Sequence, residues 1–262
     1  MKKLVSALMC SAMVLGCFAG CSTATSGGTK VGVSMPTKDL QRWNQDGANM
    51  QSQLEDAGYS VDLQYASNDP QTQLSQIENM ISSGCKVLVI AAIDGSSLGE
   101  ALDMAEDKDV PVIAYDRLLM DSDSVDYYAT FDNYKVGTVQ GQYIADTLDL
   151  ENAAGPFNLE ITAGDPGDNN ASYFYQGAMD VLQQYIDSGK LVVVSGQTAF
   201  ADVATASWAT ETAQSRAENI LSSYYADGTN VDAWLCSNDS TALGVENALA
   251  ANYTGKYPII TG

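Results

Sequence analysis

The side chains best suited to chemistry in this sequence are arginines, carboxylates, carboxamides and tryptophans that follow apolar, strand-like segments. They are Lys38, Arg42 and Trp43 after the first segment, Asp116 and Arg117 after the fourth, then Asp168, Asn169, Asn170, Asn238 and Asp239 in the second half. Planar donors and acceptors of this kind engage neighbouring hydroxyl groups in pairs, and flat aromatic faces cover C–H surfaces. The pattern predicts a binding site for an uncharged polyol such as a sugar.

Each of these residues has a simpler interpretation when it is taken alone. Asp116 and Arg117 are then a solvated ion pair, and Asn169 with Asn170 occupies an ordinary turn. Trp43 and Trp208 are then anchors of the core. The recurrence of the pattern at strand ends in both halves of the chain favours the binding site over these separate interpretations.

Covalent catalysis and metal binding find little support. The chain has no histidine, which excludes Ser-His-Asp and Cys-His nucleophiles and histidine-ligated zinc. The acidic segment 121–126 lacks the glycine and the last glutamate of an EF-hand loop, so a solvated loop is favoured over a calcium site. Walker A, dinucleotide-binding and nucleophile-elbow motifs are absent from the sequence. We expect a protein without catalytic residues, cofactor or metal.

Composition limits the partners. The 262 residues are 45% hydrophobic, which is enough for one large or two medium domains with real cores. Twelve basic residues against 33 acidic ones give a formal charge of −21, so a nucleic-acid backbone or an anionic membrane surface would repel the protein.

Short apolar segments alternate with amphipathic ones, which is typical of βαβ units with parallel sheets. We expect strands at 30–35, 61–66, 87–93, 110–115, 126–131, 157–163, 191–196, 233–237 and 257–261. A helix begins at Asp69-Pro70 and ends at Gly84, and further helices cover 134–148 and the segment after Trp208. Ligands of open parallel sheets bind beyond the carboxyl ends of the strands, where the polar residues above lie.

The N-terminus has the features of a secretory signal. A basic start precedes an apolar run, 4–19, and small residues lead to Cys21. The segment 18–21 resembles a bacterial lipobox, with Cys17 as an earlier candidate for lipidation. Cys21 is preferred because 22–29 reads as a flexible tether. We expect a lipid-anchored, extracytoplasmic protein in which Cys85 and Cys236 are buried free thiols.

Several motifs occur in an order that is similar to one known family. They are Ser34-Met-Pro-Thr-Lys38 with Arg42-Trp43, Leu74-Ser-Gln-Ile-Glu-Asn-Met80, Val87-Leu-Val-Ile90, Ala114-Tyr-Asp-Arg117, Tyr128-Ala-Thr-Phe-Asp-Asn133 and Asp168-Asn-Asn170. From about residue 30 onward the chain resembles the xylose and multiple-monosaccharide binding proteins, which are periplasmic-binding-protein type I receptors of sugar ABC transporters. The resemblance implies two Rossmann-like lobes that close on one pyranose.

The resemblance also implies roles for particular residues. Arg42, Asp116 and Arg117 match sugar contacts of the first lobe, Asn169 or Asn170 an asparagine at the start of the second, Trp208 a stacking aromatic, and Asn238 the amide of a Ser-Asn-Asp motif. Lys38 and Trp43 are weaker matches. The family continues beyond a position equivalent to Gly262, so we expect a chain truncated at its C-terminus.

These inferences define the expected organisation and function. The expected parts are a lipoprotein signal peptide (1–20), a flexible tether (21–29), an N-terminal α/β lobe (30–133) and an incomplete C-terminal α/β lobe (134–262). The expected function is delivery of a monosaccharide of the xylose, glucose, galactose or arabinose class to an ABC permease by a monomeric carrier, which in some relatives also docks on a chemoreceptor. A sugar-sensing ectodomain and a secreted carbohydrate-active enzyme with paired carboxylates are the alternatives.

Overall fold

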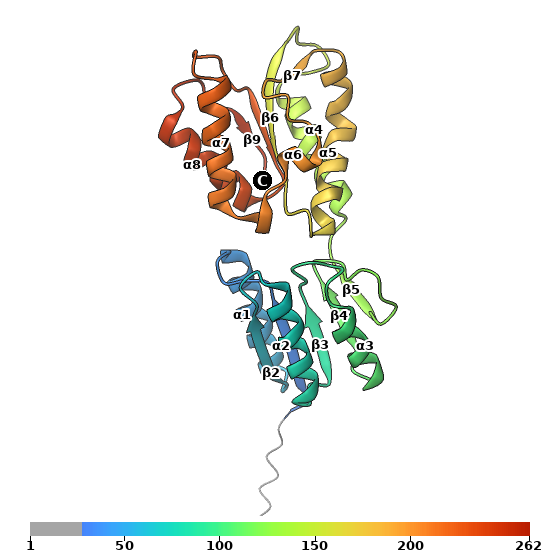
Figure 1. The fold of residues 1–262 in the computed structure, drawn as a ribbon. Coiled ribbons are helices and arrows are strands. Elements are labelled where there is room, and N and C mark those ends of the chain that lie inside the picture. Colours follow the sequence, from blue (N-terminus) through green and yellow to red (C-terminus); the bar gives the residue numbers. More distant parts are fainter. Residues whose placement is uncertain (1–27) are drawn as a thin grey trace, which may run out of the picture.

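The structure is a computed structural model, and it describes residues 28–262. The predicted signal segment and both candidate lipidation sites, Cys17 and Cys21, lie outside the described residues. The described chain forms two α/β units, one above the other in Figure 1, and each is built on its own parallel sheet. This confirms the predicted α/β class with parallel sheets.

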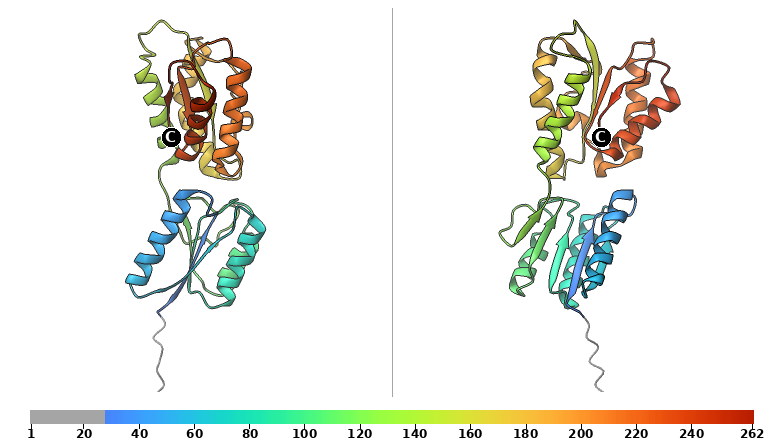
Figure 2. Two further views of the ribbon diagram at one scale, coloured as in Figure 1. Left: turned by 90° about the vertical axis from the view of Figure 1, so that its left-hand side faces the viewer. Right: turned by 180° about the vertical axis from the view of Figure 1, so that it is seen from behind.

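The first lobe is built on a five-stranded parallel sheet with the order β2-β1-β3-β4-β5. Its strands are β1 (Lys30–Met35), β2 (Ser60–Tyr65), β3 (Val87–Ile90), β4 (Val112–Tyr115) and β5 (Tyr127–Ala129). Helix α1 (Gln41–Asp56) covers one face, and α2 (Pro70–Ser82) and α3 (Gly99–Asp107) cover the other (Figure 2). Two separate apolar clusters fill the space on the two faces, which accounts for the continuous Val/Ile runs in the central strands.

The second lobe is built on a four-stranded parallel sheet with the order β7-β6-β8-β9. Its strands are β6 (Phe157–Thr162), β7 (Leu191–Val193), β8 (Ala233–Cys236) and β9 (Ile259–Ile260). Its helices are α4 (Asn133–Thr147), α5 (Asn169–Asp187), α6 (Phe200–Val203), α7 (Thr210–Tyr224) and α8 (Asp239–Asn252), with a 3₁₀ turn at Ala206–Trp208. Helices α4 and α5 share one core cluster and α7 and α8 the other.

Local sequence explains where these elements begin and end. The carboxylate of Asp69 accepts a hydrogen bond from Thr72 N at the start of α2, and Pro70 occupies the first helical turn. Gly84 follows the helix with φ +91°, a left-handed conformation that favours glycine. The predicted helix was therefore correct at both ends.

The predicted strands are all present, but several are shorter than expected. The third ends at Ile90 rather than Ile93, because the N–H of Ile93 donates to Oε1 of the buried Gln73 (2.8 Å) instead of to a strand. Gln73 also donates to Ser34 Oγ and to Ala91 O. One buried side chain thus holds the carboxyl ends of two strands at the edge that faces the second lobe.

Cys85 and Cys236 are buried free thiols, as predicted. Burial raises the pKa of both thiols, so neither is suited to act as a nucleophile. Within residues 28–262, none of the helices combines the length and the apolar character that a membrane span requires.

Candidate functional site

A buried ion pair joins the two lobes. Arg117 follows β4 in the first lobe and Asp168 precedes α5 in the second, and Arg117 Nε lies 2.9 Å from Asp168 Oδ2. Both side chains are nearly inaccessible, with 8% and 3% of their surface exposed. Arg117 also donates to the carbonyl oxygen of Ala92 (2.9 Å). The chain therefore brings together strand ends that are separated by about fifty residues of sequence.

Asp168 connects several partners through one carboxylate. Its Oδ1 accepts from Asn170 N and thereby caps α5, while Oδ2 accepts from Trp208 Nε1 at 3.0 Å and faces Arg117. Burial raises the pKa of the Asp168 carboxyl, and the positive charge of Arg117 opposes this shift without cancelling it. Asp168 was recognised in the sequence as a strand-end residue but was not selected as a ligand contact. Its position directly before a helix N-terminus was a signal that it would cap the helix, whereas its burial depends on the tertiary structure.

A second polar contact between the lobes lies beside the first. Asn170 Nδ2 donates to the carbonyl oxygen of Asp116 (3.0 Å), and Asn170 Oδ1 accepts from Asn133 Nδ2 (2.9 Å). Asp116 has φ +62°, an uncommon conformation for a residue other than glycine, and Tyr128 and Thr130 also donate to its carbonyl. Strained backbone of this kind is concentrated at functional sites.

Arg42 reaches the same group of residues from α1. Its Nη2 lies 2.6 Å from Asp116 Oδ2, and its Nε lies 3.3 Å from Asp46 on the next helical turn. Burial lowers the pKa of Arg42, but the charges of Asp116 and Asp46 and the hydrogen bond to Asp116 together outweigh this effect, so the pKa is raised and the guanidinium stays charged. Half of the Arg42 side chain is exposed, so its donors remain accessible to a ligand.

Trp43 lies between the two arginines. The guanidinium carbons of Arg42 and Arg117 lie 4.6 and 5.1 Å from the centre of its rings. The side chain is 3% exposed. Trp43 therefore packs in the core and orients both guanidinium groups by cation–π contact, a role that combines the two interpretations of this residue from sequence.

Trp208 is held in a fixed pose in the second lobe. Ser207 and Trp208 both have left-handed backbone, with φ of 56° and 55°, and Ser207 N donates to Asp165. The indole lies against Gly164, where the side chain of any other residue would overlap the ring. Trp208 is only 3% exposed and meets Phe174 edge to face at 6.2 Å. The strained turn and the adjacent glycine fix the orientation of the ring.

Asn238 lies in a cavity of about 830 Å³ lined by both lobes. Arg42 and Gln45 of α1 line the cavity from the first lobe, and Gln140 and Asn238 line it from the second. Asn238 caps α8, because its Oδ1 accepts from Thr241 N at 2.9 Å. Its Nδ2 is the part of the side chain left to face a ligand.

Lys38 and Asn169 are not part of this group. Lys38 is exposed, and its Nζ lies 5.0 Å from the ring centre of Tyr65 in a separate surface hollow. Asn169 lines another hollow, of about 240 Å³, together with Tyr128 and Tyr173. Adjacent helical residues point in different directions, which is why Asn170 faces the lobe junction while Asn169 faces this hollow.

The assembled residues suit a neutral polar ligand. Arg42 pairs with Asp116 and Arg117 with Asp168, the carboxamides of Asn170 and Asn238 add donors and acceptors, and the carboxylates of Asp39, Glu211 and Asp239 at the cavity disfavour an anionic ligand. Within the described part of the chain, no group of three or more acidic or cysteine side chains is arranged to hold a metal ion. The arrangement can therefore bind hydroxyl groups in fixed orientations.

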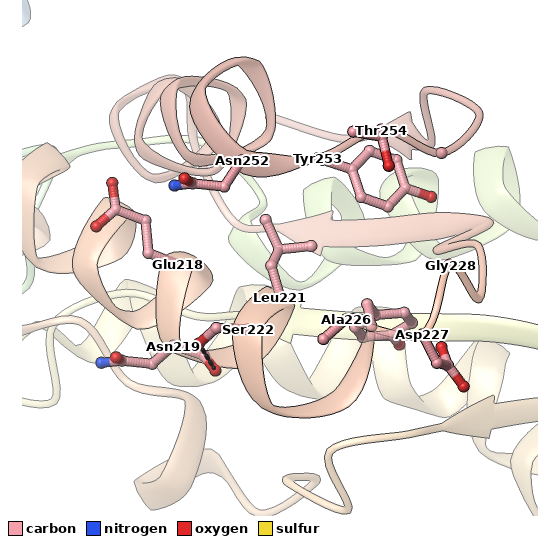
Figure 3. A pocket seen from close by; sticks show the side chains of 12 residues that line it. Glu218, Asn219, Leu221, Ser222, Ala226, Asp227, Gly228, Asn252, Tyr253 and Thr254 are labelled. Atoms are coloured by element: carbon pink, nitrogen blue, oxygen red, sulfur yellow. Dashed lines mark hydrogen bonds between the residues drawn. The ribbon is translucent and has the colours of Figure 1, made fainter.

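A second cavity, of about 660 Å³, lies elsewhere in the second lobe (Figure 3). It is formed between the C-terminal ends of α7 and α8, whereas the N-terminal ends of these helices line the cavity between the lobes. None of the residues predicted from sequence lines it. Of those residues, Arg42 and Asn238 line the cavity between the lobes, which is therefore the candidate functional site.

The fold is that of a two-lobed α/β binding protein, with a candidate ligand site at the junction of the lobes. Residues 31–262 match the model of the periplasmic binding protein domain, and the chain belongs to this family, in its type I form.

Two proteins that are similar to this chain are named for the sugars that they bind. The multiple sugar-binding periplasmic receptor ChvE of Rhizobium radiobacter is 50% identical, with 100% of this chain and 75% of the relative covered. The D-xylose-binding periplasmic protein of Escherichia coli is 38% identical, with 88% of this chain and 65% of the relative covered. The chain thus spans three quarters of ChvE's length and slightly under two thirds of the xylose-binding protein's.

Solved structures agree with this assignment. An ABC transporter solute binding protein from Clostridium phytofermentans with bound β-D-glucose is 70% identical, with a TM-score of 0.87 over 89% of this chain and 72% of that one. A carbohydrate transporter solute binding protein from Chloroflexus aurantiacus in complex with D-glucose is 35% identical, with a TM-score of 0.77 over 88% and 72%. The resemblance inferred from the motifs is confirmed.

Proposed function

We propose that this protein binds one monosaccharide, of the glucose or xylose class, between its lobes and presents it to an ABC importer in the membrane. The observation that carries the proposal is the continuous set of polar contacts across the junction, from Arg42 through Asp116 and Asn170, and from Arg117 to Asp168. The glucose bound to two related proteins supports this ligand class.

The proposed contacts divide into groups with different roles. Arg42, Asp116 and Asn170 orient hydroxyl groups by paired hydrogen bonds, and Asn238 adds a donor from the second lobe. Trp208 is 3% exposed, so the predicted stacking on the C–H surface of the sugar requires its ring to become exposed in the complex. Arg117 and Trp43 hold the other groups in place from the interior.

Hinge closure would couple binding to delivery. A ligand that contacts both lobes stabilises the closed arrangement in proportion to its additional contacts there, so the permease can distinguish loaded from empty carrier. Anchoring of the carrier on the outer face of the membrane through Cys21 completes the proposal, and its support is the sequence of the N-terminal segment.

A thermal-shift panel tests the proposal directly. The chain from Ser22 is melted with xylose, glucose, galactose, arabinose, ribose or fructose, each in large excess. A sugar at about 100 times its dissociation constant stabilises the native state by roughly 2.7 kcal/mol, which is a shift of several degrees. We expect a selective shift with one or two of the six sugars.

Matched variants connect any shift to the site. Arg42→Met removes a guanidinium from the cavity, whereas Lys86→Met removes an exposed charge from the opposite end of the first sheet. The shift should shrink in the first variant and persist in the second. A cooperatively folded protein that gives no shift with any sugar would refute the proposal.

A further inference from the structure

Gln140 of α4 lines the cavity between the lobes but does not belong to the set of residues that the motifs predict. Its side chain is 8% exposed. Its Nε2 donates to the carbonyl oxygen of Ser237 at 3.2 Å. Its Oε1 is buried and has no hydrogen-bond partner among residues 28–262.

The bond from Gln140 ends on the residue directly before Asn238. Ser237 is the first residue after β8, and its carbonyl belongs to the turn from which Asn238 projects into the cavity. The side-chain oxygen of Asn238 accepts from Thr241 N and Thr241 Oγ1, which fixes the carboxamide relative to the first turn of α8, and the bond from Gln140 fixes this turn relative to α4. Helix α4 thereby reaches across the lobe and holds this turn.

We propose that Gln140 is a positioning residue for the sugar site, which aims Asn238 at the ligand by holding the carbonyl of Ser237. This inference rests on the proposed sugar-binding function and adds a residue to its site. It assigns to α4 an indirect role in ligand affinity, besides the Val136 and Gln140 side chains that line the cavity.

The unpaired Oε1 of Gln140 distinguishes a positioning role from a purely structural role. A buried acceptor without a donor destabilises the native state. Gln140→Leu removes this unpaired oxygen but takes the donor from the buried Ser237 carbonyl, so one unpaired acceptor replaces another and the net effect on folding is close to neutral. Functional sites are where such costs to stability are retained.

The experiment compares Gln140→Leu with Gln142→Leu. Gln142 lies on the same helix, is exposed, and donates only to Asp146 one turn along, so its replacement controls for the substitution itself. For the sugar that gives the largest shift with the unmodified protein, we expect Gln140→Leu to weaken affinity about two- to tenfold, as for one ordinary hydrogen bond. The melting temperature without sugar should stay the same or rise.

A double-mutant cycle tests whether Gln140 acts through Asn238. Asn238→Ser keeps a capping oxygen at the start of α8 but removes the Nδ2 group. Gln140→Leu should then cost much less affinity in the Asn238→Ser background than in the unmodified protein.

Different outcomes test the positioning role of Gln140 and the proposed sugar-binding function separately. If the unmodified protein binds no sugar, the proposed function fails and this inference with it. If the unmodified protein binds but Gln140→Leu behaves as Gln142→Leu does, only the inference is overturned. A fall in melting temperature that accompanies the loss of affinity, or full additivity with Asn238→Ser, would equally overturn the positioning role.

Discussion

Arg117→Met leaves the Asp168 carboxylate buried without its counter-charge. Asp168 is 3% exposed in the ion pair, and it would keep only the donors of Asn170 and Trp208. Methionine fills much of the arginine's volume, so the change in charge dominates over the change in packing. The carbonyl of Ala92 also loses its donor.

The size of the effect follows from burial. Removing one partner of a buried ion pair costs about 3–5 kcal/mol, whereas an exposed pair contributes about 1 kcal/mol or less. Arg42→Met is the matched control, because Arg42 is half exposed, against 8% for Arg117. We expect Arg117→Met to destabilise the protein by about 3 kcal/mol more than Arg42→Met does at pH 8.

The loss should depend on pH in a defined direction. Burial already raises the folded-state pKa of Asp168 above its unfolded value of about 3.9, and loss of Arg117 raises it further. The folded state then binds a proton more tightly than the unfolded state, so its stability is greatest at low pH and declines as the pH rises through the folded-state pKa. Between pH 5 and pH 8 the variant should therefore lose stability more steeply than the unmodified protein.

Urea unfolding followed by tryptophan fluorescence measures these differences. Adding Asp168→Asn to Arg117→Met removes the unpaired charge, so the double variant should recover most of the lost stability and lose the steep pH dependence. Asp168→Asn alone should also destabilise the protein, because it leaves the buried Arg117 guanidinium without its counter-charge. The reasoning is wrong if Arg117→Met and Arg42→Met are equally stable, or if Asp168→Asn fails to rescue.

Two further predictions concern packing and reactivity. Gly177→Ala should destabilise the protein by about 1–3 kcal/mol, because the new methyl group would overlap the Tyr134 carbonyl where α5 packs against α4. Gly99→Ala is the control. It has open space at its position and should be neutral or slightly stabilising in the same melts. Cys236 should not react with a thiol reagent in the native protein and should react on denaturation, because it is buried and burial raises its pKa. Cys236→Ser, measured in parallel, identifies the share of the released absorbance that comes from Cys236. Rapid labelling of Cys236 in the native protein would contradict its placement in the core.

Much of the fold could be predicted from sequence because its signals are local. The alternation of Val/Ile runs with amphipathic segments identified each strand, and the Asp69-Pro70 cap with Gly84 bounded one helix correctly. The ends of strands were less predictable. Ile93 leaves the sheet because of Gln73, which lies twenty residues earlier in the chain.

The candidate site divides in the same way. Chemical type and position after strands were sufficient to select Arg42, Asp116, Arg117 and Asn170, which the structure brings into one set of contacts. The same criteria could not separate Asn170 from Asn169, since that depends on which way each helical residue points.

The sequence by itself determined the class of the protein: parallel α/β units, a polar and charge-balanced set of strand-end residues, no histidine chemistry, and motifs of a sugar-binding family. Only the tertiary structure decided the burial of Asp168, its pairing with Arg117, and the bond from Gln140 to Ser237. Patterning and motifs are encoded within a few residues of one another. A buried charge pair or an acceptor without a donor depends on segments far apart in the chain, and exists only once the sheets and helices have brought those segments together.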